Sequence, residues 1–166
     1  MASLKNFNYF TAKWLSMFSK STEYALRAII YLAQKSSVDS KIGIAELSEA
    51  IDSPKSFTAK ILQKLTKDNK LVSSATGPTG GFYLSDEAKK KSVFHVLTIL
   101  EDDTTITGCI LGLKECSEIN PCPMHAQYKK IKPQLLEMLD KKSILELSYE
   151  MKDPKVVIHN ITGKVR

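Results

Sequence analysis

The sequence predicts a mainly α-helical fold, a winged helix-turn-helix with a small β-hairpin wing, followed by a long C-terminal helix. Three observations predict it. A helical segment at residues 21–34 is followed by a short one at 44–51, a tight turn and a third one from residue 54. Next, the glycine-rich turn 76–81 separates two short strand-like runs, as in a hairpin. Last, apolar residues recur at helical spacing from about residue 123 to beyond 139.

The first helix contains an apolar run with a candidate cap at its start. Ser21 or Thr22 can cap it, and the residues up to Gln34 are apolar nearly all round, so we expect the helix to be buried. The later helices have similar signals, since Ser92 can cap a helix that ends near Leu100, and residues 143–149 suit one or two more helical turns.

The third helix is expected to run from Pro54 to about Lys67, with Ser53 as its cap and Pro54 as its first helical residue. Its apolar face should lock it on the core, and its opposite, lysine-rich face suits the major groove of DNA. The apolar face consists of Phe57, Ile61, Leu62 and Leu65.

Two segments are therefore expected to contact DNA. Lysines contact mainly phosphates, whereas small and amide side chains can reach base edges. A turn rich in glycine can approach the DNA backbone closely because it lacks bulk. The expected contacts are Lys55, Ser56, Thr58, Ala59, Lys60, Gln63 and Lys64 on the helix, and Thr76, Gly77, Thr79 and Gly80 on the wing. The alternative is an ordinary solvated amphipathic helix beside a hairpin.

Length and charge fit this interpretation. With 166 residues, 43% of them hydrophobic, the chain suits one domain with an extension, and its net charge of +6 suits an anionic partner. No apolar run approaches the ~20 residues of a transmembrane helix, so no membrane partner is expected. We divide the chain into an N-terminal extension (1–16), which is either a disordered arm or a short amphipathic helix, the winged helix-turn-helix (17–100), a loop (101–125), a long-helix region (126–152) and a tail (153–166).

All three cysteines fall in one loop, at Cys109, Cys116 and Cys122, with His125 three residues further on. Thiolates are soft ligands, and Gly112 gives the loop freedom to turn them inward. An odd number of cysteines and the lack of a signal sequence indicate a reducing cytoplasm. We expect Cys122 at the N-terminus of the long helix, where the helix dipole favours a thiolate.

Four uses of these cysteines are open. They can hold an iron–sulfur cluster with a fourth ligand from elsewhere, or zinc together with His125. The gaps between the cysteines lack the close pair that zinc sites usually carry. A metal-free thiol switch and inert buried cysteines are the other two alternatives.

Several stretches together resemble a known family. Residues 23–28 (EYALRA), residues 60–65 (KILQKL), the wing sequence GGFYL at 80–84 and the three-cysteine loop are similar to the iron–sulfur transcription regulators that include IscR and NsrR. Cysteine-metabolism repressors without clusters belong to the same family. The resemblance covers roughly residues 17–142.

The resemblance implies a homodimer that crosses through its long C-terminal helix and binds palindromic double-stranded DNA. It implies a 2Fe–2S or 4Fe–4S cluster on the three cysteines, with His125 or Glu23 of the other subunit as fourth ligand. The spacing between Cys109 and Cys116 is one residue longer than the commonest spacing in the family. Thr76 replaces an arginine that many members carry before the wing glycine, and this change concerns readout of the minor groove. Ala59 replaces a larger polar residue of some members, so base preference should differ.

We therefore expect a bacterial, cytoplasmic DNA-binding repressor or activator whose cluster responds to nitric oxide, redox state or iron–sulfur status. A cluster-free, zinc or thiol-switch regulator of the same fold is the alternative. An electron carrier or redox enzyme is a weaker rival, because the sequence has no nucleotide fingerprint or substrate-binding motif. Neither an enzymatic activity nor a small-molecule substrate is expected.

Overall fold

The computed structural model describes residues 17–67 and 71–151, so the expectations for residues 1–16 and for the tail lie outside the described residues. The mainly α-helical fold with a two-stranded antiparallel hairpin is confirmed. In chain order the elements are α1 (Lys20–Lys35), α2 (Ile44–Ala50), α3 (Lys55–Thr66), β1 (Ser73–Ala75), β2 (Gly81–Tyr83), α4 (Asp86–Lys89), α5 (Val93–Ile99), α6 (Thr104–Thr107), α7 (His125–Lys141) and α8 (Ile144–Glu150).

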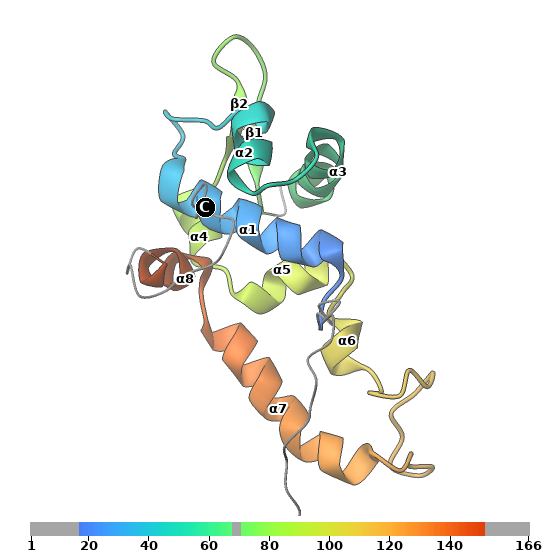
Figure 1. Cartoon of the computed structure of the whole chain (residues 1–166). Helices are drawn as coiled ribbons and strands as arrows, with labels where there is room; N and C mark the ends of the chain where they lie inside the picture. Colours follow the sequence, from blue (N-terminus) through green and yellow to red (C-terminus); the bar gives the residue numbers. More distant parts are fainter. Residues whose placement is uncertain (1–16, 68–70, 152–166) are drawn as a thin grey trace, which may run out of the picture.

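Helix α1 is the centre of the fold. It packs against α2, α3, α5 and α8, as Figure 1 shows, and Ala25, Ala28, Ile29 and Leu32 on it are fully buried. The predicted cap was placed too late. The hydroxyl of Ser19 accepts the hydrogen bond from the backbone of Thr22, because the helix already begins at Lys20.

Helix α3 packs its predicted apolar face on the same core. Ile61, Leu62 and Leu65 are buried and Phe57 is half-buried. The predicted start was wrong by one residue. Pro54 is the cap, and its carbonyl oxygen accepts the first backbone hydrogen bonds of the helix, whereas the Ser53 hydroxyl is buried with no hydrogen-bond partner in the described part of the chain.

The wing strands form the expected short hairpin, but β1 lacks the first two residues of the strand-like run 71–75, and β2 begins one residue before the run 82–84. They pair over three residues each, with Ala75 opposite Gly81, while Leu71, Val72 and Leu84 outside them are buried in the core. Gly80 cannot take a side chain, since a Cβ there would lie 2.5 Å from the carbonyl oxygen of Ala75. This close approach requires glycine at the base of the wing turn.

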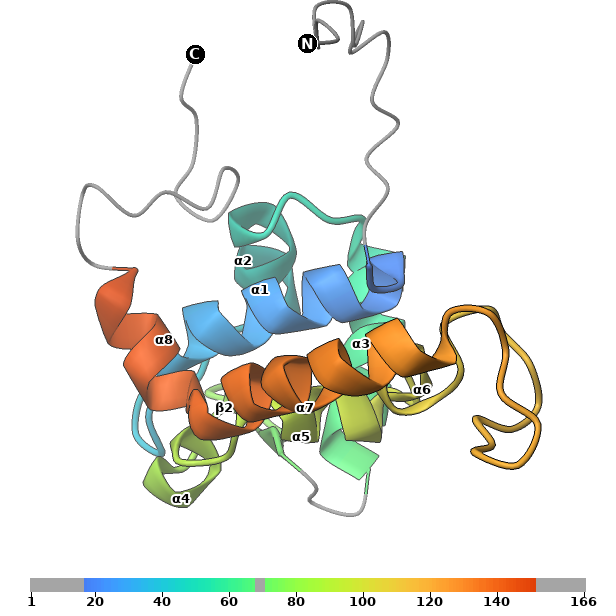
Figure 2. The ribbon, with the colours of Figure 1, turned by 90° about the horizontal axis from the view of Figure 1, so that it is seen from below.

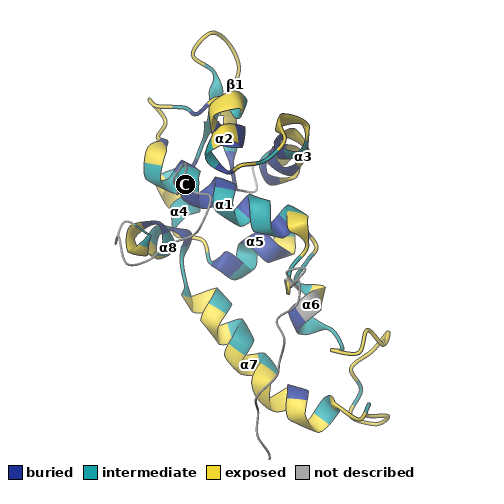
Figure 3. Ribbon diagram, in the orientation of Figure 1, coloured by how far each residue is buried: buried dark blue, intermediate teal, exposed yellow. Residues whose placement is uncertain are grey.

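Helix α7 leaves this core, as Figures 1 and 3 show, and of its 17 residues only Tyr128 is buried. The helix runs through Pro133. Helix α8 then turns back onto α1, and its start is closed by a capping box in which Ser143 and Glu146 exchange hydrogen bonds. Figure 2 shows α8 at one end of α7 and the cysteine loop at the other.

Candidate nucleic-acid interface and metal centre

The outer face of α3 has the expected polar character. Six of the seven predicted helix residues are exposed, and they are Lys55, Ser56, Ala59, Lys60, Gln63 and Lys64. The face combines three lysines with short polar and amide side chains, so it can contact both phosphates and base edges.

Thr58 does not belong to this face. It is fully buried, and its hydroxyl donates to the carbonyl oxygen of Pro54. The sequence contained a signal for this position, because Thr58 lies three, four and seven residues before Ile61, Leu62 and Leu65 and therefore on their side of the helix. Its polar side chain led to the wrong assignment.

The wing lies at the same end of the molecule as α2 and α3, far from the cysteine loop (Figure 1). Thr76, Gly77 and Thr79 at its tip are exposed and Gly80 is half-buried. Lys41 adds a positive charge at its base, with the ammonium group 5.9 Å from the centre of the Tyr83 ring. A basic helix face and a narrow turn thus occupy one end of the molecule.

At the opposite end, the cysteine loop brings its predicted ligands together as two pairs. The sulfur atoms of Cys109 and Cys122 lie 4.0 Å apart, and the sulfur of Cys116 lies 3.4 Å from Nδ1 of His125. All three cysteines are reduced, Cys116 is exposed and the other two are half-buried. Within the described residues, no three His, Cys, Asp or Glu side chains gather closely enough to hold one metal ion.

The loop also favours the thiolate form of Cys109. Backbone N–H groups of Leu111 and Leu113, and then the thiol of Cys122, lower the pKa of Cys109 below its ordinary value. Gly112, between the two leucines, has a φ of +70°, which lets the backbone turn its N–H groups toward the sulfur.

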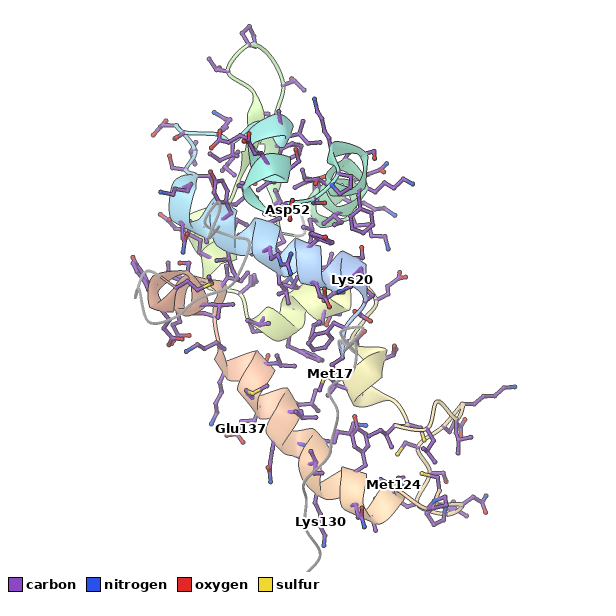
Figure 4. The ribbon with its side chains drawn as sticks, viewed as in Figure 1. Met17, Lys20, Asp52, Met124, Lys130 and Glu137 are labelled. Carbon is purple, nitrogen blue, oxygen red and sulfur yellow. The ribbon has the colours of Figure 1, made fainter. Side chains whose placement is uncertain are left out.

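Cys122 does not begin a helix, contrary to expectation. Helix α7 starts at His125, and the carbonyl oxygen of Cys122 accepts a hydrogen bond from the backbone of His125, so Cys122 lies one turn earlier. Figure 4 labels Met124, the capping residue, where the loop joins α7. The helix therefore positions the imidazole of the predicted ligand set directly, and the loop positions the thiols.

Glu23, the other candidate fourth ligand, lies in the first turn of α1. Its carboxylate forms an ion pair with Lys20 at 2.6 Å, and its side chain is 19% exposed. In Figure 1 α1 and the cysteine loop occupy different parts of the protomer. A role for Glu23 as a ligand would therefore use the loop of another subunit.

Sequence reasoning missed Tyr128, which lies close to one cysteine of each ligand pair. It lines a cavity of about 680 Å³ beside Cys109 and one of about 280 Å³ beside Cys116. Burial, and then the negative charges of the Cys116 and Cys109 thiolates, raise the pKa of Tyr128. Its hydroxyl donates to the carbonyl oxygen of Ile106 at 2.8 Å. A helical spacing predicts a buried tyrosine here, but not this distant partner.

Comparison with known proteins gives a consistent result. Residues 18–150 match the family Rrf2, described as "Iron-dependent Transcriptional regulator". A protein assigned as an HTH-type transcriptional regulator in Aquifex aeolicus is 31% identical over 79% of this chain and 90% of its own length. The HTH-type transcriptional regulator IscR of Yersinia pseudotuberculosis is 28% identical over 75% of this chain and 74% of its own.

A solved structure agrees in fold. CymR, the global cysteine regulator of B. subtilis, superposes with a TM-score of 0.62 at 20% identity, covering 80% of this chain and 95% of that protein. Among the described residues, no helix is both long and apolar enough to cross a membrane.

Proposed function

This chain belongs to the Rrf2 family of transcriptional regulators, and we propose that it is a homodimeric, palindrome-binding member whose affinity for DNA depends on an iron–sulfur cluster held by Cys109, Cys116, Cys122 and His125. The cluster would make the regulator respond to nitric oxide, oxidants or iron–sulfur supply. The single observation that supports the proposed cluster is that its four ligands lie in two close pairs.

The two distances have the right size for shared metal ions. Two thiolates bound tetrahedrally to one ion at about 2.3 Å lie about 3.8 Å apart, and a thiolate and an imidazole about 3.5 Å apart. The separations of 4.0 Å for Cys109 and Cys122 and of 3.4 Å for Cys116 and His125 match these values. Each pair therefore suits one ion.

Two pairs favour a 2Fe–2S cluster over the alternatives. Such a cluster takes two protein ligands on each iron, and an imidazole can replace a thiolate. A 4Fe–4S cluster takes one ligand per iron, so its ligands need not pair, and a single zinc ion needs all four donors at one point. We therefore assign His125 rather than Glu23 as the fourth ligand.

The long helix supports the proposed dimer. Ile131 and Met138 on α7 are 51% and 60% exposed, and Leu135 and Leu139 on the same side are half-buried. Such a stripe on a helix with little cover is typical of a helix–helix interface. Two copies joined here would each present one α3 face to a half-site of a palindrome.

Within this function, the residues have separate tasks. The lysines of α3 attract the phosphate backbone, Ser56 and Gln63 lie where base edges can be read, and the wing turn contacts the flanking backbone. When bound, the cluster supplies a centre that nitric oxide and oxidants attack. The loop would be held in one arrangement when its four ligands bind the cluster, and these ligands are Cys109, Cys116, Cys122 and His125. A different arrangement of the loop would shift α7.

The first test is chemical analysis of protein purified without oxygen. We expect about two irons and two sulfides per chain, the content of one 2Fe–2S cluster. Cys116→Ala should reduce the iron to background, whereas Lys114→Ala, an exposed loop position that is not a ligand, should retain it. Unchanged iron in Cys116→Ala, or colourless wild-type protein after anaerobic reconstitution, would overturn the cluster.

A metal-free thiol switch is the second candidate, favoured by the same Cys109–Cys122 approach. Their sulfur atoms need to move from 4.0 Å to about 2.05 Å to form a disulfide. In that case peroxide would be reduced to water, both thiols would be oxidised to one disulfide, and Cys116→Ser would respond to peroxide as the wild type does. Iron content separates the two candidates directly.

A further inference from the structure

The cysteine loop and the recognition helix α3 lie at opposite ends of the protomer, so a sensor needs a physical connection between them (Figure 1). The connection begins at Tyr128. Its ring lines the cavities beside both Cys109 and Cys116, and it is 6% exposed. A movement of either thiol therefore changes the surroundings of this ring.

From Tyr128 the contacts lead to α6. The Tyr128 hydroxyl donates to the carbonyl oxygen of Ile106 at 2.8 Å, and the ammonium group of Lys132, one turn further on, donates to the carbonyl oxygen of Thr107. Ile106 itself is fully buried. These contacts tie the short helix α6 to α7, so α6 must follow a shift of α7.

The segment before α6 is attached to the start of α1. Asp102 precedes α6 by two residues, and its Oδ2 accepts a hydrogen bond from the backbone N–H of Ser19 at 2.8 Å. Ser19 is the cap of α1. Met17, just before it, lines the cavity beside Cys109 and is labelled near α6 in Figure 4. The beginning of α1 is thus held by the segment that leads into the cysteine loop.

Helix α1 reaches α3 through a pair of aromatic rings. Tyr24, in the second turn of α1, meets Phe57 of α3 edge to face, with the ring centres 5.6 Å apart. The guanidinium group of Arg27 lies over the ring of Tyr24, 5.0 Å from its centre. Phe57 follows Ser56 and precedes the rest of the DNA-facing residues of α3. A small rotation of α1 therefore changes the direction in which α3 presents this face.

We propose that Tyr128 and Asp102 are positioning residues that couple the cysteine loop to the recognition helix, through the contacts Tyr128–Ile106, Asp102–Ser19 and Tyr24–Phe57. The inference rests on the proposed function. Neither residue needs to touch DNA or to bind the cluster. Their hydrogen bonds decide how far a change in the loop alters the orientation of α3.

The test compares the DNA affinity of cluster-loaded and cluster-free protein for wild type and variants. The probe is a duplex selected from a random pool with the cluster-loaded wild type. Tyr128→Phe removes only the hydroxyl and keeps the ring. Tyr31→Phe is the matched control, since it removes a tyrosine hydroxyl that donates to Glu46 at 3.1 Å but lies off the proposed route.

We expect the wild-type affinities to differ by about 5- to 150-fold between the two states. In Tyr128→Phe this ratio should fall to about twofold or less, at unchanged iron content and visible spectrum, and in Tyr31→Phe it should keep its wild-type value. A merely structural role of Tyr128 would lower stability or both affinities together and leave the ratio unchanged.

Asp102 gives a second test that does not alter the surroundings of the thiols. Asp102→Ala should reduce the ratio, and Asp102→Asn, which keeps an oxygen acceptor for Ser19, should restore most of it. A full wild-type ratio in both Tyr128→Phe and Asp102→Ala would overturn the coupling while leaving the regulator intact. Equal affinities of the two wild-type states would instead overturn the proposed function.

Discussion

The winged helix-turn-helix and the region that follows it use their apolar residues differently. In α1, α3 and α5 these residues form a closed core, which contains Leu32, Leu62 and Leu97. In α7 and the cysteine loop, large apolar side chains such as Leu113 and Met138 are more than half exposed. In Figure 3 the dark blue of buried residues lies mainly on α1, α2, α3 and α5, whereas α7 and the loop beside it are mostly yellow.

This difference shows which region has a complete hydrophobic core within one protomer. A domain with its own core can fold alone, whereas an exposed helix with few contacts and a loop of thiols gain much of their stability from what they bind. The first region therefore supplies a rigid DNA-facing surface. The second is suited to sensing in the proposed function, because its arrangement would depend on the proposed partner subunit and cluster.

The largest expected effect tests this contrast in stability. Leu62→Ala, at a position that is 1% exposed, should lower the free energy of unfolding by about 2–5 kcal/mol. Ile119→Ala, at a loop position that is 89% exposed, should change it by less than about 0.5 kcal/mol. Urea unfolding of the metal-free protein measures both. A similar loss in the two variants would contradict the division.

The next effect concerns self-association. Ile131→Glu places a charge in the proposed α7 interface and should weaken dimerisation by about 100-fold, or about 2.7 kcal/mol. Ala126→Glu adds the same charge at an exposed position of α7 that lies five residues before Ile131, on the other side of the helix from the apolar stripe, and should remain dimeric. Light scattering over a concentration series gives the association constant. A dimer that survives Ile131→Glu would place the interface elsewhere.

The fold followed from the sequence wherever local spacing decides it. The apolar face of α3 is confirmed, since residues three and four apart lie on one side of a helix whatever its surroundings. The cap of α5 by Ser92 is confirmed as well, because capping depends on neighbouring residues alone. The buried Thr58 shows that this spacing was more reliable than residue polarity. Helix boundaries were less predictable, because Ser19 and Ser21 are equally good caps by chemistry.

The site was predictable in its residues but not in its arrangement. Clustered cysteines indicated the loop, yet their division into Cys109 with Cys122 and Cys116 with His125 depends on the path of the loop backbone. The contact of Asp102 with Ser19 joins residues 83 positions apart, and that of Tyr128 with Ile106 joins residues 22 apart. Spacing within one element carries no information on such pairs.

A smaller effect distinguishes lysines of the two regions in DNA binding. Lys60→Ala on α3 should reduce the slope of log affinity against log salt by about 0.9 for each subunit, because one phosphate contact is lost. Lys130→Ala removes an equal charge from α7, where Figure 4 labels it, and should leave the slope unchanged. A titration of salt against an operator duplex measures this. Equal slopes in both variants would mean that only net charge matters.

The smallest expected effect is the pH dependence of Cys109 in the cluster-free protein. Its lowered pKa means that the folded state favours the thiolate, so this group stabilises the fold above the ordinary thiol pKa, and the contribution is lost as pH falls through the folded pKa. Alkylation of Cys109 by iodoacetamide should therefore begin at lower pH in folded than in urea-unfolded protein, as peptide mass spectrometry can follow.

The cause of the lowered pKa of Cys109 can be tested at one of its backbone hydrogen-bond donors. Leu113→Pro removes one of the two backbone N–H groups that hold the thiolate, at an exposed position, and should move the alkylation profile of the folded protein toward that of the unfolded one. Leu113→Ala keeps the N–H group and should leave the profile in place. If Leu113→Ala shifts the alkylation profile as far as Leu113→Pro does, the leucine side chain rather than the backbone N–H group would control the pKa of Cys109. The loop would then resemble the core in depending on side-chain packing, and the contrast between the two regions would weaken.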